Sequence, residues 1–278
     1  MTVRQVFAAA ALTFGFATSA LAFDTPPPVD APEITTFSSA SGWYIRGDLG
    51  YNASVDFDKP TIRSFKSATN TYTSTAFDSA RFDSNYTLNA GAGYQFNDWL
   101  RSDLTLDYFK GTFDGKSTIN KPCSAIQPNK TKCGSSYEQA LASLGLMANG
   151  YVDLGTYWGL TPYLGAGAGV TNMDYGSMTA SKYCVSGGGK CDKFTDYKNK
   201  NYGGEESWRF TYALMAGVSY DVATNLKLDL GYRFSQVEGG DMFKWSSQEV
   251  MNGARGVKGT DDGFSRHEFR AGLRLTGW

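Results

Sequence analysis

The chain has 278 residues, with 26 Lys or Arg against 27 Asp or Glu, and a net charge of −1 at pH 7. This near neutrality argues against a nucleic-acid partner, which a clustered basic face would favour. The mean hydropathy is −0.34, and no segment beyond the amino terminus offers about 18 uninterrupted apolar residues, so the sequence excludes transmembrane helices.

The amino-terminal segment has the pattern of a secretory signal peptide. Arg4 precedes an apolar stretch too short to span a membrane, and this stretch ends in the small-x-small sequence of Ala20–Ala22. We therefore predict a signal peptide at 1–22, cleaved after Ala22. The following residues, 23–41, contain four prolines and are expected to form an extended periplasmic linker before a single domain at 42–278.

Within that domain, apolar and polar residues alternate in a series of short segments. In chain order these predicted strands lie at residues 42–53, 85–96, 100–108, 140–154, 163–170, 207–221, 226–234 and 266–275. The second and third are separated only by the polar turn Asn97–Trp99. The register of the fourth is ambiguous, because Leu141 and Met147 interrupt its alternation.

The clearest alternation runs from Ser207 to Asp221. Every second side chain there points to one face of the predicted strand, and this face is formed by Trp208, Phe210, Tyr212, Leu214, Ala216, Val218 and Tyr220. Aromatic residues at both ends with aliphatic residues between them are typical of a lipid-facing strand with two interfacial girdles. The pattern predicts an outer-membrane β-barrel.

The connections predict how the barrel is oriented. They are long, roughly 25 to 35 residues, after the first, third, fifth and seventh strands, and short after the others; bacterial barrels place short turns in the periplasm. We therefore expect an all-β, eight-stranded antiparallel up-and-down transmembrane barrel with four long extracellular loops and both termini in the periplasm. Runs such as Tyr72–Phe77 are interpreted as strand extensions above the membrane, and a ten-stranded barrel is the alternative.

The inward faces of the predicted strands carry seven cations and six anions. They are Arg46, Asp48, Arg101, Asp103, Asp107, Asp153, Arg209, Lys227, Asp229, Arg233, Glu268, Arg270 and Arg274. Because the interior of an eight-stranded barrel is only wide enough for its own side chains, we expect these groups to pair in a charged core. A narrow or gated ion pore is the alternative.

The four cysteines agree with export to an oxidising compartment. Cys123 and Cys133 flank one polar segment, and Cys184 and Cys191 flank another. Local pairing is the simplest of three possible connectivities and would staple two loops with disulfides. A four-thiolate metal site is disfavoured, because neither pair has the spacing of zinc ligands. We expect no metal and no cofactor.

Two further motifs resemble functional sites but lack the structural context that such sites need. The run Gly165–Gly169 resembles a phosphate-binding loop, but it continues a strand and no helix follows. His267, the one histidine, lies close to Ser265 and could suggest a hydrolytic site, yet alternation directs Glu268 into the lumen and away from His267. We therefore expect no enzymatic activity.

Aromatic and basic residues of the long connections suggest an outer binding surface. They include Lys130, Lys132, Tyr183, Lys190, Lys193, Tyr197, Lys198 and Lys200. Attraction to anionic lipopolysaccharide explains lysines in this position without a specific ligand. A host molecule or small ligand bound by the loops is the alternative.

Three segments carry a resemblance to a known family: Gly42–Tyr51 (GWYIRGDLGY), Thr161–Gly167 (TPYLGAG) and His267–Arg274 (HEFRAGLR). They resemble the small porin-family outer-membrane β-barrel proteins of alphaproteobacteria, which are related to the OmpA transmembrane domain. The resemblance implies the fold and a Gram-negative outer-membrane location. Family members end in an aromatic residue that the outer-membrane assembly machinery reads; here that residue is Trp278, one position out of step with the last strand.

For activity, the resemblance implies a range of roles, since such proteins are described as structural surface antigens, host-contact proteins, haem binders and weak porins. We expect a structural barrel that supports the envelope and displays surface loops. A narrow porin for ions or small solutes, and a loop-mediated adhesin or ligand receptor, for example for haem, are the alternatives.

Overall fold

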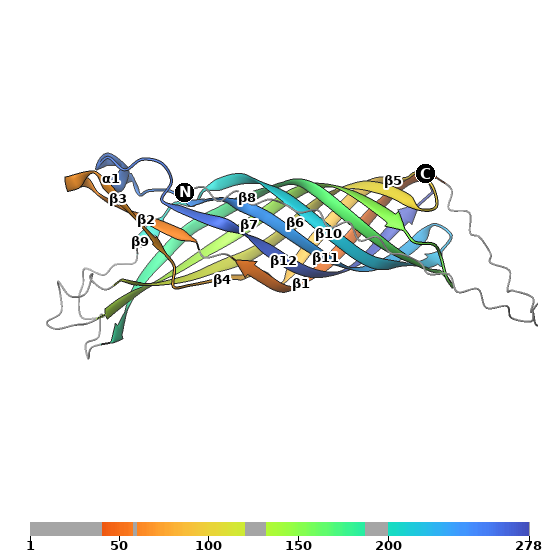
Figure 1. Cartoon of the computed structure of the whole chain (residues 1–278), viewed down its shortest axis with the longest axis horizontal. Coiled ribbons are helices and arrows are strands. Elements are labelled where there is room, and N and C mark those ends of the chain that lie inside the picture. Colours follow the sequence, from red (N-terminus) through yellow and green to blue (C-terminus); the bar gives the residue numbers. More distant parts are fainter. Residues whose placement is uncertain (1–40, 58–59, 120–131, 187–199, 278) are drawn as a thin grey trace, which may run out of the picture. The chain divides into compact units, whose positions relative to one another are not determined.

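The computed structural model describes residues 41–57, 60–119, 132–186 and 200–277 (Figure 1). The predicted signal peptide and nearly all of the predicted linker lie outside these residues. The predicted barrel domain begins where the first strand does, at Gly42.

The described residues contain twelve strands and two short helices. The strands are β1 (Gly42–Phe57), β2 (Thr61–Lys66), β3 (Thr71–Ala76), β4 (Ser79–Asp83), β5 (Tyr86–Gln95), β6 (Leu100–Ile119), β7 (Lys132–Asp153), β8 (Leu160–Ser186), β9 (Lys200–Tyr202), β10 (Glu206–Ala223), β11 (Leu226–Phe243) and β12 (Gly259–Thr276). A 3₁₀ turn, η1, covers Ser67–Thr69, and helix α1 covers Ser247–Met251. In the part of the chain that is described, no helix has the length and apolarity to cross a membrane.

The strands form one antiparallel sheet that closes on itself. Its order is β1-β5-β6-β7-β8-β10-β11-β12, and β12 returns to pair with β1 (Figure 1). β4 pairs with β6 above β5, β9 pairs with β8, and the hairpin of β2 and β3 extends from β12. Closure leaves the wall of the ring without a free edge.

The number of strands differs from the eight expected from the alternation. The additional strands lie in the connections predicted as long loops, which contain paired segments of their own. Tyr72–Phe77, interpreted from the sequence as a strand extension, largely coincides with β3. For β2, β4 and β9 no bounds were predicted, because polar segments carry no apolar alternation even where their backbone groups pair with neighbouring strands.

Side chains alternate between the outer surface and the lumen along the ring. On β1, Trp43 and Leu49 are 59% and 53% exposed, whereas Tyr44 and Arg46 are buried inside. Leu141 and Met147, which interrupt the alternation of β7, are also buried. Their apolar side chains occupy inward positions, so the register of β7 is continuous there except for one irregularity between Gln139 and Leu141.

The interior has two layers of different chemistry. Toward the short turns, which we call the short-turn end, the lumen holds mainly arginines, carboxylates and tyrosines. Toward the long connections, the long-loop end, it holds an apolar layer formed by Phe77, Phe82, Phe109, Phe113, Tyr137, Leu141, Met173, Tyr175, Met178, Val237, Met242, Phe243 and Phe264. The apolar layer was not predicted from the sequence.

Candidate functional site

The charged layer is built from pairs of inward positions. Arg46 and Asp48 lie two residues apart on β1 and therefore share the lumen face. Arg46 donates through Nε and Nη2 to Asp48 at 2.9 and 2.7 Å. Its Nη1 donates to Asp103 of β6 at 3.0 Å and to the Tyr151 hydroxyl of β7 at 3.1 Å. One guanidinium thus connects three strands of the ring.

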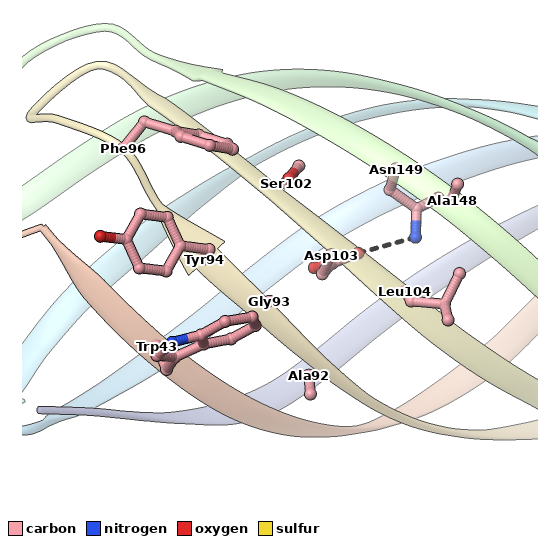
Figure 2. Close-up of a pocket in the computed structure, with 10 residues that line it drawn as sticks. All are labelled: Trp43, Ala92, Gly93, Tyr94, Phe96, Ser102, Asp103, Leu104, Ala148 and Asn149. Carbon is pink, nitrogen blue, oxygen red and sulfur yellow. Dashed lines mark hydrogen bonds between the residues drawn. The ribbon is translucent and has the colours of Figure 1, made fainter. Parts of the chain in front are cut away.

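Asp103 is the main acceptor at this level. Besides Arg46, it accepts from the Tyr44 hydroxyl at 3.1 Å and from Asn149 Nδ2 at 2.8 Å. Figure 2 shows Asn149 and Asp103 pointing toward one another between neighbouring strands. With these donors, both oxygens of the buried carboxylate are satisfied.

Arg101 and Arg274 are buried toward the short-turn end of the lumen. Arg101 Nε donates to Asp153 at 3.1 Å, and its guanidinium lies 4.1 Å from the ring centre of Tyr151. Its two Nη atoms have no hydrogen-bond partner among the described residues, and the tyrosine face partly compensates their charge. Arg274 donates through Nε to Asp229 at 3.1 Å.

A second group of charges lies in the middle of the lumen. Arg233 Nη2 donates to Asp107 at 2.7 Å. Arg270 approaches the same carboxylate at 3.5 Å and also pairs with Glu268. Arg266 lies 4.0 Å from Glu268. Three guanidiniums therefore share two carboxylates at this level.

Two predicted residues lie apart from this network. Arg209 pairs with Asp261 at 2.8 Å, higher in the lumen and next to the apolar layer. Lys227 pairs with Asp221 close to the turn that joins β10 and β11, where both side chains keep some exposure. The remaining predicted charges lie together inside the ring.

Arg266 and Asp261 are buried lumen charges that the prediction omitted. Both belong to β12, which begins at Gly259, several residues before the predicted strand. Arg266 lies two residues before Glu268, so alternation alone would have placed it inside. Asp261 precedes the bend at Gly263, whose φ of +97° breaks the regular pattern, and it had no such signal.

Burying the charged layer has an energetic cost as well as a gain. Removing two ions from water costs several kcal/mol each, and a buried pair recovers this only with good geometry and further hydrogen bonds. Breaking such a pair leaves an uncompensated charge. The network therefore holds its own side chains in place and fills the lumen with them.

A pocket of about 720 Å³ opens on the ring near the short-turn end (Figure 2). Its lining combines small and large side chains from neighbouring strands: Trp43, Ala92, Gly93, Tyr94, Phe96, Ser102, Asp103, Leu104, Ala148 and Asn149. Trp43, Phe96 and Leu104 are exposed on the outer surface. Its two inward polar residues bond to one another, so the pocket presents mainly apolar contact.

Most residues of the predicted disulfides and of the predicted basic surface lie outside the part of the chain that the structure describes. Cys123 and Cys191 lie outside the described residues, and for Cys133 and Cys184 only the backbone is described. The register of β7 with β8 places Cys133 opposite Cys184, whereas local pairing predicts a different partner for each. The predicted basic surface lies outside the described side chains.

His267 faces outward on β12 in a small cluster. Its Nδ1 lies 2.5 Å from the Tyr232 hydroxyl, and its Nε2 lies 3.8 Å from Asp56, whose side chain is exposed. Glu268 points into the lumen. The glycine run Gly165–Gly169 lies inside β8, which continues as a strand to Ser186 and does not turn into a helix.

Comparison with known proteins decides the family. A family model described as outer membrane protein beta-barrel domain matches residues 8–275. The chain belongs to this outer-membrane β-barrel family. An uncharacterized protein of Brucella abortus (strain 2308) is 37% identical over 251 residues, which cover 84% of each chain. The family therefore places the chain in the Gram-negative outer membrane and confirms the resemblance seen in the sequence.

Other similar proteins have lower sequence identity to this chain. A Rickettsia conorii protein named "Putative adhesin" is 27% identical over 280 residues, covering 98% of this chain and 99% of that protein. Among solved structures, Neisserial surface protein A is 18% identical with a TM-score of 0.41, covering 85% of this chain and 99% of its own.

Proposed function

We propose that this barrel is a structural outer-membrane protein whose closed lumen passes no solute and whose long connections are displayed at the cell surface. The observation that carries the proposal is the filled interior. Arg46 reaches Asp103 on one side of the ring, and Arg233 reaches Asp107 from the opposite side. The apolar layer continues above them, with members such as Phe113 and Met173 fully buried.

The geometry of the ring supports this proposal. The eight strands that close on one another form a barrel of the width that side chains fill without leaving a channel. The wall exposes an apolar outer surface with aromatic residues such as Trp43 and Trp208, which suits contact with membrane lipid and lipopolysaccharide. The short turns and both termini lie in the periplasm, and the long connections lie outside the cell. The assembly machinery reads the last strand.

Deletion of the chain in its own cell tests the envelope role. We expect the deletion to raise sensitivity to detergents and large antibiotics, and the wild-type chain to restore resistance. A variant in which residues 61–76 are replaced by a short Gly-Ser turn should restore resistance equally, because the ring itself remains. Normal resistance of the deletion strain would contradict the structural role.

A second candidate function is recognition of a partner by the extracellular connections. It is favoured by the ordered contacts of β2 and β3 with the α1 segment, the connection at residues 244–258 between β11 and β12, and by the names of the Rickettsia relatives. For this function, the variant without residues 61–76 should lose binding to host cells or ligand while keeping the envelope intact. Unchanged binding by that variant would count against recognition through this hairpin.

A further inference from the structure

The hairpin of β2 and β3 continues the barrel sheet beyond the ring. β2 pairs with β12 through Ile62 with Gly259 and Thr61 with Thr260. β3 pairs with β2 along all six of its residues, and in the described part of the chain no strand pairs with its other side. In Figure 1, β3 lies beside α1, at the end of the molecule away from the short turns. β3 is thus an edge strand outside the closed wall.

The hydrogen-bond pattern shows which backbone groups this edge presents. Arg63 is directed away from β3, because its N–H donates to the Lys258 carbonyl at 2.7 Å. Its partner in the hairpin is Ser74. In an antiparallel ladder, the backbone N–H and C=O groups of two paired residues point either toward each other or away from each other, and these two kinds of pair alternate. The N–H and C=O of Ser74, and by alternation those of Tyr72 and Ala76, therefore point to the free edge.

The edge is held in place by contacts on one face of the hairpin. The Tyr72 ring packs between Phe65, with ring centres 4.9 Å apart, and Trp245, at 6.0 Å. The Tyr72 hydroxyl accepts from the Arg255 backbone N–H at 2.9 Å, and the Arg63 guanidinium lies 4.4 Å from the Tyr72 ring centre. A preorganised edge loses little conformational entropy when a further strand is added.

The sequence of β3 lacks the features that usually protect an edge. Thr71–Ala76 reads Thr-Tyr-Thr-Ser-Thr-Ala, with high β-propensity and neither charge nor proline. Natural edges are commonly blocked by lysine, proline or bulges. The hairpin's charges are Arg63 and Lys66 of β2, with no acidic residue in either strand. A neutral or acidic partner therefore fits this surface better than a basic one.

We propose that the free edge of β3 binds an extended, neutral-to-acidic segment of a partner protein by strand addition. This inference rests on the recognition role and specifies its surface and the chemistry of its partner. Main-chain hydrogen bonds from Tyr72, Ser74 and Ala76 supply the affinity, as in other complexes of this type. The side chains that flank the edge supply the charge preference.

The test measures, by fluorescence anisotropy, how tightly a labelled peptide binds to the full chain in nanodiscs. The peptide has seven residues, alternating Thr and Val with a central Glu. Ser74→Pro removes one outward N–H without removing a bond to β2, and Ser74→Ala is the matched control that keeps it. We expect Ser74→Ala to bind the peptide like wild type. Ser74→Pro should bind it about tenfold more weakly, which corresponds to about 1.4 kcal/mol of binding free energy. A peptide with a central Lys should also bind more weakly.

A fully N-methylated form of the peptide tests the main-chain hydrogen bonds without any change to the protein. It cannot donate main-chain hydrogen bonds, so wild-type protein should not bind it. The inference is overturned by equal binding of the plain and methylated peptides, by no saturable binding of the plain peptide, or by self-association of the protein through this edge in its place. If host-cell binding survives Ser74→Pro in a folded protein, recognition stands and strand addition at β3 fails.

Discussion

Arg233 of β11 reaches across the lumen to Asp107 of β6, with Nη2 2.7 Å from Oδ2, although the two residues are 126 positions apart in the chain. The two strands lie on opposite sides of the ring. Both side chains are almost fully buried. The pair therefore joins opposite walls and lies across the middle of the lumen.

Removing one member of this pair should destabilise the barrel strongly. In Arg233→Met, Asp107 loses its closest cation, and breaking a buried pair costs about 3 to 5 kcal/mol. We expect the heat-dependent mobility shift of the unboiled protein on gels to occur at a markedly lower temperature. The double variant Arg233→Met with Asp107→Leu should recover part of the loss, because the buried carboxylate that loses its 2.7 Å partner is removed as well.

Arg81→Met is the control for this measurement. Arg81 pairs with Asp83 at 3.4 Å on the outside, where both side chains are well exposed. Exposed pairs contribute little to stability. If Arg81→Met and Arg233→Met lower the temperature of the mobility shift equally, the lumen pair contributes no more to stability than an exposed pair does.

Much of this charged core follows from the sequence, because alternation is a local property of a strand. Once Trp43 and Leu49 are assigned to lipid, Arg46 and Asp48 must point inward. Which cation meets which anion depends on the closure of the ring, so the partnership of Arg233 with Asp107 could not be predicted.

The close approach of Tyr44 to Gly93 predicts a steric effect. A Cβ at Gly93 would lie 2.4 Å from the Tyr44 ring and 2.4 Å from the Ser102 carbonyl oxygen. Gly93→Ala should therefore displace Tyr44 and destabilise the barrel by about 1 to 3 kcal/mol, a typical cost of overpacking. Gly150→Ala is the matched control, since nothing lies within 4 Å of its added Cβ. Urea midpoints in detergent micelles that agree for the two variants would contradict the packing.

The outer surface should tolerate charge only outside the membrane. Leu214 of β10 is 57% exposed within the apolar face of that strand. Leu214→Arg should cost about 2 to 4 kcal/mol if the position lies near the bilayer midplane. Glu138→Arg, on the outward face of the long-loop part of β7, is the control and should leave folding into vesicles unchanged. Equal folding yields for both variants would argue against a lipid-facing band.

The α1 segment should respond to acid. Burial alone would raise the pKa of Glu249, but hydrogen bonds from Lys258 and Ser246 outweigh it, and the pKa of Glu249 is lowered from 4.5. A carboxyl whose folded pKa is depressed stabilises the fold above its unfolded pKa, and this stabilisation is lost as the pH falls through the folded value.

Trp245 fluorescence should therefore change below pH 4.5, since Trp245 lies in the same segment and donates to the Arg255 carbonyl at 3.2 Å. Glu249→Gln should remove most of this pH dependence, and Glu238→Gln should retain it. An identical acid transition in both variants would show that another group is responsible.

The layer above the charges shows where prediction from sequence ends. Phe109 and Met173 occupy inward positions of long strands, and their apolar side chains look like errors of register in a simple alternation. They become intelligible only when β6 and β8 are seen to continue past the predicted strand ends and to enclose a common apolar core. The β2–β3 hairpin was foreseen in part at Tyr72–Phe77, whereas its docking on Trp245 depends on contacts distant in sequence.

The closed lumen is tested most directly by recording from planar bilayers that contain the purified, folded protein. With Arg233 and Asp107 in place and the apolar layer above them, the barrel should show no steady unitary conductance above the bare bilayer. Arg233→Ala with Asp107→Ala, which clears the centre of the lumen, should increase ion leakage. A steady, reproducible conductance in the wild-type protein would contradict the closed barrel and favour the narrow porin.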